Sequence, residues 1–92
     1  MSRVERIRQA LESAFAPSVL VVNDDSHKHA GHEGARDGRG HFSVEIVSEA
    51  FTGKMPLARH RAVYSALGEM MATDIHALSI HARAPAEPAA DN

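Results

Sequence analysis

The feature that most constrains this chain is a long polar segment, residues 24–40, which separates two short apolar runs. The segment is rich in glycine and histidine and holds almost no apolar side chain, so it adds little to a core. The run before it, residues 19–22, is mostly β-branched and lies between Pro17 and Asn23, which is typical of a strand. The pattern predicts a long loop between two strands, and such a loop in a small chain is usually functional or disordered.

Two other segments have the apolar spacing of helices. Apolar residues three and four apart, after the N-cap residue Ser2, predict a helix over residues 3–15 that ends before Pro17. Pro56 suits the first turn of a second helix, predicted over residues 57–72. The apolar stripe of this helix consists of Leu57, Val63, Tyr64, Leu67, Met70 and Met71.

Alternating apolar residues predict a second strand over residues 41–48 and a third over residues 77–83. The first two strands would pair antiparallel across the loop, and a right-handed crossover through the second helix would make the second and third parallel. The expected fold is α+β, of order αββαβ, with a three-stranded mixed sheet and helices on one face. We expect one domain over residues 1–84 and a disordered tail, rich in alanine and proline, over residues 85–92.

Composition narrows the classes of function. The chain has 92 residues and no cysteine, so it has neither disulfides nor a thiolate metal site. Its formal charge of -2 is no signature of a nucleic-acid binder, although seven histidines would add positive charge on mild acidification. The N-terminus lacks the features of a targeting peptide, and no run has the ~18 apolar residues of a membrane span. We therefore expect a cytoplasmic protein without a membrane partner.

The histidines are the strongest candidates for chemistry. His27, His29, His32 and His41 lie in or at the end of the polar loop, and His76 opens the last strand. Imidazole is a ligand suited to Zn, Cu, Fe and Ni, and a glycine-rich loop can bring two imidazoles together. The spacing matches no zinc motif, and the alternative is that these are solvated loop histidines.

Nothing in the chain predicts an enzyme. The sequence lacks a nucleophile elbow, a phosphate loop and an H-E-x-x-H pattern. Asp24, Asp25 and His27 could be combined into a catalytic set, but short loops rarely hold such geometry without support. The sequence favours a binding protein without catalytic turnover.

Four segments resemble the BolA family: VVNDDSHKHAGH, HFSVEIVSEAFTGK, ARHRAVYSALGEMM and DIHALSIHA. The most specific parts are F-x-G-K followed by R-H-R-x-V-Y, and the I-H-A-L segment. The resemblance implies a fold similar to the type II KH domain. It also implies a monothiol glutaredoxin as partner, with a 2Fe–2S cluster shared between the two proteins and glutathione supplied by the partner. Alone, such a chain would bind no cofactor and would be a monomer or a weak homodimer.

The resemblance also implies which histidines are ligands. His76 in I-H-A-L matches the histidine with which BolA proteins ligate the cluster. The second ligand of the family comes from the loop between the first two strands, where His29 is the best match and His41 is the rival. His27 and His32 match less well.

Strand parity places His76 on the same face as Leu78 and Ile80, which predicts partial burial, whereas His81 should face away from the core. Because the chain has no thiolate, it cannot assemble an iron–sulfur cluster alone. It could complete one, with histidine on one iron and the partner's thiolates on the other, as in Rieske centres. Ligation needs neutral imidazole, so it should weaken as the pH falls below the histidine pKa. The implied role is an adaptor in cluster assembly or iron sensing.

A DNA-binding regulator is the alternative, because some BolA proteins are described as such. Lys54, Arg59, His60 and Arg61 place positive charge near the start of the second helix, where phosphate contacts are common. Against this, the G-K-M-P turn differs from the G-x-x-G loop with which KH domains clamp a nucleic-acid backbone. The same four residues could instead contact a glutaredoxin or form an ordinary solvated helix face.

Overall fold

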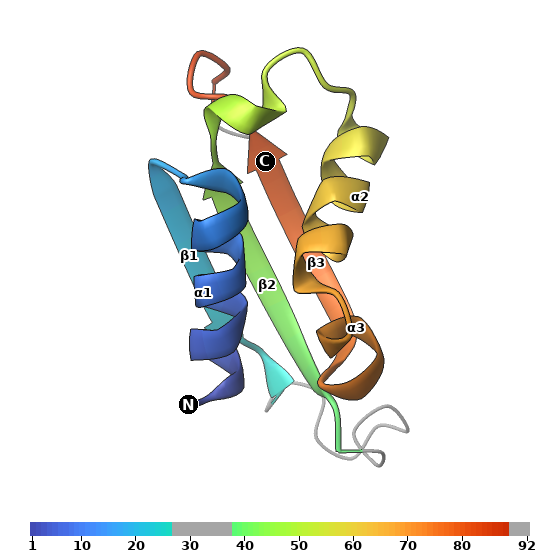
Figure 1. Ribbon diagram of the computed structural model, residues 1–92. Helices are drawn as coiled ribbons and strands as arrows, with labels where there is room; N and C mark the ends of the chain where they lie inside the picture. The colour runs from blue at the N-terminus through green and yellow to red at the C-terminus, as the bar shows by residue number, and fades with distance from the viewer. Residues whose placement is uncertain (27–37, 89–92) are drawn as a thin grey trace.

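The computed structural model describes residues 1–26 and 38–88, whose strands form one three-stranded sheet of order β1-β2-β3. β1 and β2 are antiparallel, and β2 and β3 are parallel. Figure 1 shows α1 and α2 over one face of this sheet, so the predicted α+β fold with a mixed sheet is confirmed. The bounds of the elements are α1 Arg3–Phe15, β1 Val19–Asp24, β2 Gly40–Val47, η3 Glu49–Phe51, α2 Pro56–Leu67, α3 Met70–Thr73 and β3 Ile75–Arg83.

The first helix has the predicted bounds because both of its ends are capped locally. The side chain of Ser2 accepts a hydrogen bond from the N–H of Glu5 at 3.1 Å, which satisfies one of the free donors of the first turn. At the other end, Ala16 adopts a left-handed conformation with φ 43°, and its N–H donates to the carbonyl of Glu12. Pro17 follows and cannot continue the helix.

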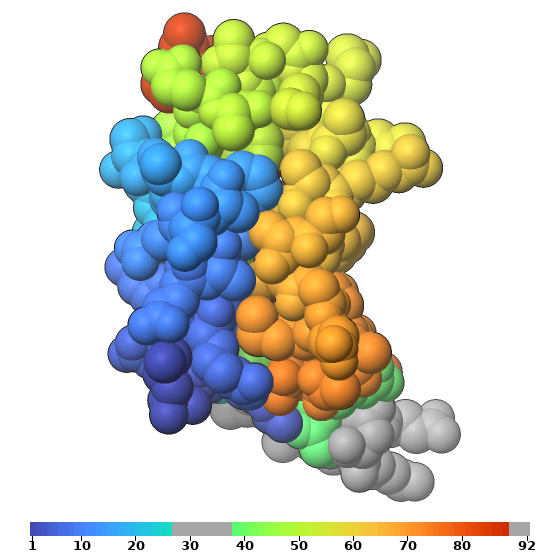
Figure 2. Space-filling model, in the orientation of Figure 1, coloured from blue at the N-terminus to red at the C-terminus, as the bar shows by residue number. Residues whose placement is uncertain are grey.

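The core lies between the sheet and the two long helices. Ile7 and Leu11 of α1 and Val63 and Leu67 of α2 are buried against the strands. Complete burial of one such side chain stabilises the fold by about 1.5–3 kcal/mol. Figure 2 shows the surfaces of α1 and α2 meeting over this layer. The sheet contributes Phe42, Val44, Ile46, Ile75 and Ile80.

The second helix is shorter than predicted. α2 ends at Leu67, because Gly68 has a φ of 57° and a ψ of -128°, a conformation that glycine adopts without strain. A separate short helix, α3, follows, so the prediction of one helix over residues 57–72 is wrong. The change of direction leads the chain to Ile75, where β3 begins before the predicted start at residue 77.

The end of the sheet where β2 and β3 finish is closed by buried contacts, and we call it the closed end. Phe51 of η3 is fully buried, and its ring centroid lies 5.0 Å from that of Phe15. The buried hydroxyl of Ser48 donates to the carbonyl of Phe15 at 2.7 Å and accepts from the N–H of Ala50 at 3.1 Å. These contacts fix the turn that leads from β2 towards α2.

Candidate functional site

Two of the predicted ligands lie next to each other at the opposite end of the sheet, where the parallel strands β2 and β3 both begin (Figure 1). The ring centroids of His41 and His76 are 5.1 Å apart, and their planes are tilted by 46°. His76 is exposed, whereas His41 is half-buried. We refer to these two residues as the histidine pair.

The exposure of His76 contradicts the partial burial predicted for it. The pairing of β2 with β3 shifts register at this point: Gly40 is opposite Ile75. The next residue of β2, His41, is already opposite Ala77. His76 is therefore the extra residue of a β-bulge, where the alternation of faces is interrupted. Ile75 takes the buried position, and His76 faces solvent.

His41 is positioned by its backbone. Its N–H donates to the hydroxyl of Ser26 at 3.1 Å, and its carbonyl accepts from the N–H of Asp25 at 2.7 Å. A side chain on the preceding residue would force its neighbours to shift, because a Cβ on Gly40 would lie 2.7 Å from both the Phe42 ring and the Ser26 hydroxyl. A hollow beside the pair is lined by Asp25, His41, Phe42, Ala77, Leu78 and Ser79.

The two chain segments that carry the pair are joined to each other and to α1 by residues that sequence analysis did not single out. The N–H of Gly40 donates to the carbonyl of Asp74 at 2.9 Å. The carboxylate of Asp74 accepts from Arg6 at 2.9 Å, and this hydrogen bond holds the pKa of Asp74 below its usual value. Arg3 donates to the carbonyl of Gly38 at 2.6 Å. Partners this far apart in sequence have no local signal that would have revealed them.

A third contact at the pair involves Arg39. Its Nη2 atom lies 3.2 Å from Nδ1 of His76, within hydrogen-bonding distance. The side chains of Arg39 and His76 therefore lie at the same end of the sheet, Arg39 just before β2 and His76 near the start of β3. The sequence did not predict this contact, because it depends on the register of the bulge.

The remaining loop histidines lie outside the described residues. These are His27, His29 and His32, so the preferred second ligand, His29, is not placed by the structure. Within residues 1–26 and 38–88, no group of three or more histidine, cysteine, aspartate or glutamate side chains is arranged to hold a metal ion. The histidine pair is thus too small a donor set for a closed metal site of its own, which needs four ligands.

Arg59 was predicted on the binding surface, but the structure buries it. Its guanidinium makes two hydrogen bonds of 2.7 Å to the carboxylate of Glu87 and one of 3.2 Å to the carbonyl of Ala82. Only 10% of its side chain is exposed. Arg59 is therefore a structural residue of the closed end and offers no surface charge for phosphate or for a partner.

Glu87 lies in the segment that we expected to be a disordered tail. The hydrogen bonds from Arg59 lower the pKa of its carboxyl from 4.5 to about 2, with help from the N–H of Ala84. Residues 85–88 thus form a turn that is bound to α2, and ordered structure continues past the boundary predicted at residue 84. The remainder of the predicted tail, residues 89–92, lies outside the described residues.

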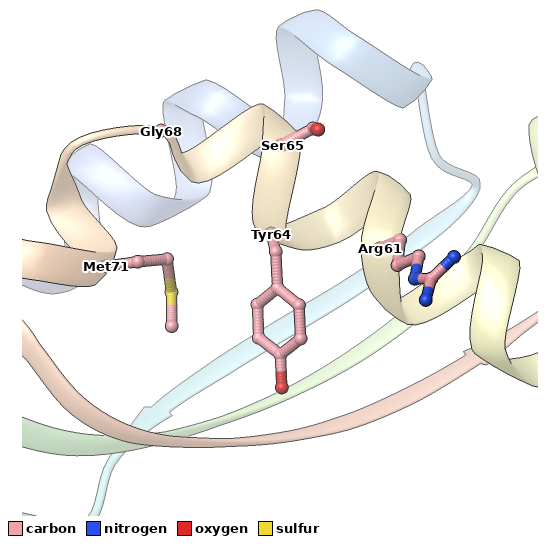
Figure 3. Close-up of a pocket in the computed structure, with 5 residues that line it drawn as sticks. All are labelled: Arg61, Tyr64, Ser65, Gly68 and Met71. Atoms are coloured by element: carbon pink, nitrogen blue, oxygen red, sulfur yellow. The ribbon is translucent and has the colours of Figure 1, made fainter.

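The other predicted surface residues remain accessible. Lys54 and Arg61 are exposed, and His60 is half-buried. Figure 3 shows Arg61 and Tyr64 on α2 beside a hollow that Met71 of α3 completes. Of the four predicted basic residues, Arg59 is thus the one that the structure buries, and Arg61 lies next to the aromatic ring of Tyr64.

Comparison with known proteins identifies relatives over most of the chain. A family model described as BolA-like protein matches residues 11–87. The chain is 46% identical over 91 residues to SufE-like protein 1, chloroplastic/mitochondrial, of Arabidopsis thaliana, covering 94% of this chain and 24% of that protein. It is 44% identical over 77 residues to the Escherichia coli (strain K12) protein named DNA-binding transcriptional regulator BolA, covering 84% of this chain and 70% of that protein.

Solved structures agree with the sequence comparison. The BolA domain of SufE1 from Arabidopsis thaliana matches with a TM-score of 0.84 at 44% identity, covering 96% of this chain and 98% of that one. BolA1 from the same plant matches with a TM-score of 0.82 at 40% identity, with the same coverage. This chain belongs to the BolA-like family.

The chain spans about a quarter of SufE-like protein 1 and 56% of another Arabidopsis thaliana relative, Protein BOLA1, chloroplastic. No helix of the described residues is long and apolar enough to cross a membrane. Because some relatives carry organelle names, the cytoplasmic location stays a prediction.

Proposed function

We propose that this chain is an adaptor that binds a monothiol glutaredoxin and contributes histidine to a 2Fe–2S cluster shared by the two proteins, in iron–sulfur cluster assembly or iron sensing. The observation that carries the proposal is the histidine pair at the end of the sheet where β2 and β3 begin. His76 is exposed at a β-bulge, with the ring of His41 5.1 Å away. An exposed imidazole can reach a metal on the surface of a partner, which a sealed core histidine cannot.

The donor set supports a shared cluster rather than a site of the chain's own. Two imidazoles leave two of the four ligand positions of a 2Fe–2S cluster to be filled from elsewhere, and this sequence has no thiolate to fill them. A glutaredoxin thiolate and glutathione would supply the missing sulfur. In this proposal the cluster is cargo that passes between proteins, and the chain does no catalysis.

The roles of the residues follow from imidazole chemistry. His76 would ligate one iron, with His41 or the loop residue His29 as the second candidate ligand. Histidine in place of thiolate raises the reduction potential of a 2Fe–2S centre, which would distinguish the shared cluster from one held by thiolates alone. Ligation requires neutral imidazole, so the shared complex should lose affinity on acidification.

The test is reconstitution with a monothiol glutaredoxin, iron, sulfide and glutathione, followed by visible absorption and circular dichroism. The mixture should give a chromophore that differs from that of the glutaredoxin alone, and His76→Ala should abolish the difference. His81→Ala is the matched control, because His81 is exposed on the same strand away from the pair. An unchanged spectrum on adding the wild-type chain would exclude a shared cluster.

The same assay assigns the second ligand. His41→Ala and His29→Ala should differ in their effect, because only a ligand shifts the absorption bands. If both variants retain the wild-type spectrum, then His76 is the single ligand from this chain, and the proposed pair is reduced to one residue.

DNA binding is the second candidate function. The observations in its favour are the exposed Arg61 beside Tyr64 on α2 and the name of the Escherichia coli relative, DNA-binding transcriptional regulator BolA. Arginine can contact phosphate while an aromatic ring stacks on a base. Arg61→Ala should then weaken salt-dependent binding to a specific DNA sequence, measured by fluorescence anisotropy. Arg59→Ala would not test this surface, because Arg59 is buried in the ion pair with Glu87.

A further inference from the structure

The contact between Arg39 and His76 restricts which form of the imidazole can exist in the isolated chain. Nη2 of Arg39 lies 3.2 Å from Nδ1 of His76. A guanidinium has five donors and no acceptor, and it stays protonated in proteins. Nδ1 must therefore be the acceptor in this hydrogen bond, and its lone pair points at Arg39.

The consequence concerns the nitrogen that a metal would need. A neutral imidazole has one lone pair and one N–H, so a lone pair on Nδ1 places the proton on Nε2. The lone pair available for ligation is then the one that Arg39 occupies. If iron binds Nδ1, it competes with Arg39 directly. If iron binds Nε2, the ring has to move its proton to Nδ1, and an N–H there cannot accept from Arg39.

We infer that Arg39 is a gate on His76: its guanidinium masks the ligating imidazole in the isolated chain and has to leave when a metal cluster is bound. This inference rests on the proposed function, since it concerns the same ligand. Arg39 is then a positioning residue, and only a cluster whose iron binds the imidazole of His76 more tightly than Arg39 does can displace the guanidinium.

The surroundings of Arg39 explain how a residue at the end of a loop can hold this position. The residues on both sides of it are bound to the fold, Gly38 through its carbonyl to Arg3 and Gly40 through its N–H to Asp74. Asp74 directly precedes β3, so the backbone of Arg39 is fixed with respect to the strand that carries His76. The side chain of Arg39 is half-buried, and that of His76 is exposed, so the guanidinium can swing away without unfolding the sheet.

The experiment compares wild type with Arg39→Met, which keeps a long side chain without a donor, and Arg39→Lys, which keeps a charged donor. Arg8→Met is the control for the loss of one positive charge, because Arg8 lies on α1 and donates to the carbonyl of Leu20, outside the histidine pair and the predicted basic surface. Cluster-loaded glutaredoxin is titrated with each full-length chain, and the concentration that gives half of the mixed chromophore is measured. Binding of cluster-free glutaredoxin to the same variants shows whether the contact between the proteins has changed.

Arg39→Met should lower the half-saturating concentration about fivefold, as expected for loss of one exposed charge-assisted hydrogen bond that competes with binding. Arg39→Lys should stay within about twofold of wild type, and neither variant should alter binding of cluster-free glutaredoxin. Long-range ¹H–¹⁵N NMR on the isolated chain measures the tautomer of His76, which should not change if Arg39 has only a structural role. It should show the His76 proton on Nε2 in the wild type and a mixture of both tautomers in Arg39→Met.

The outcomes separate the two proposals. A mixed chromophore with the same or weaker affinity in Arg39→Met, or a His76 proton on Nδ1 in the wild type, overturns the gate alone. If Arg39→Lys matches Arg39→Met, the hydrogen bond is not the cause and the gate is likewise overturned. If the wild-type chain forms no mixed chromophore at all, the shared-cluster function fails and the gate fails with it.

Discussion

The two ends of the sheet differ in whether their polar side chains are buried or exposed. At the closed end, Phe51 and Ser48 are buried, and the charges of Arg59 and Glu87 satisfy each other within the chain. At the other end, the parallel strands begin with two histidines, of which His76 is exposed to solvent. The closed end pairs its buried polar groups within the chain, whereas the histidine end leaves the imidazole of His76 exposed to solvent.

In this small fold, the type of a charged or polar residue does not by itself show whether its side chain is accessible. Arg59 stands in the motif R-H-R and has the chemistry of a phosphate ligand, yet its two Nη atoms donate to the carboxylate of Glu87 and to the carbonyl of Ala82. His76 lies in β3 and was predicted to be partly buried, yet the β-bulge leaves its side chain exposed to solvent. A residue type indicates what a side chain can do, and its surroundings decide whether it is available to a partner.

The largest effect on stability should come from the core of the closed end. Phe51→Ala removes a fully buried ring that contacts Phe15, so it should lower the free energy of unfolding by about 3–5 kcal/mol. Leu57→Ala is the control, because its side chain is 62% exposed, and it should change stability by less than about 0.5 kcal/mol. Urea denaturation monitored by circular dichroism measures both. Equal losses in the two variants would remove the distinction between a packed end and an exposed surface.

An intermediate effect should come from the ion pair at the closed end, and it should depend on pH. Glu87→Gln removes the charge that Arg59 holds, so at pH 7 it should lower Tm by about 4–8 °C, the shift that a modest loss of stability causes in a domain of this size. Thermal unfolding from pH 7 down to pH 2 is the measurement. Glu45→Gln, an exposed carboxylate on β2, is the control and should leave Tm nearly unchanged.

The sign of the pH dependence follows from the lowered pKa of Glu87. A carboxyl whose pKa is about 2 in the fold and near 4.5 in the unfolded chain stabilises the fold fully above pH 4.5. That stability is lost as the pH falls from 4.5 towards 2. The Tm difference between wild type and Glu87→Gln should therefore shrink over this range, and a difference that is constant with pH would show that the ion pair is not its source.

The smallest effect on stability should come from the histidine end. His76→Ala removes an exposed side chain, so we expect Tm to change by no more than about 2 °C, even though the variant should lose the shared-cluster chromophore. Differential scanning fluorimetry provides the comparison with Glu87→Gln. A fall in Tm as large as that of the ion-pair variant would mean that His76 supports the fold, and the contrast between the two ends would be lost.

Much of the fold could be predicted because its signals are local. The helix over residues 3–15 has its own cap at Ser2 and its own stop at Pro17, and the alternating pattern around Val44 identifies β2. The break at Gly68 was missed, because a single glycine inside an apolar helical pattern is tolerated in many helices and its φ of 57° has no signature in neighbouring residues.

The candidate site was predicted less completely for a related reason. The residue types and the resemblance to the BolA family singled out His76, His41 and His29, and the absence of cysteine predicted that the sulfur ligands of any cluster would come from a partner. They did not reveal that Arg39 contacts His76, nor that Asp74 joins the two segments of the site. Such contacts link residues more than 30 positions apart, and periodicity carries no information about them.

The sequence by itself determined most of the elements, the α+β class and the available chemistry, which is that of many imidazoles and no thiolate. Only the tertiary structure decided which of these groups face outwards. The register between β2 and β3 places the bulge that exposes His76 next to His41, and the packing of α2 on β3 buries Arg59 against Glu87. Short-range periodicity follows from backbone geometry, whereas strand register and ion pairing are set by contacts between distant segments, which exist only once the chain has folded.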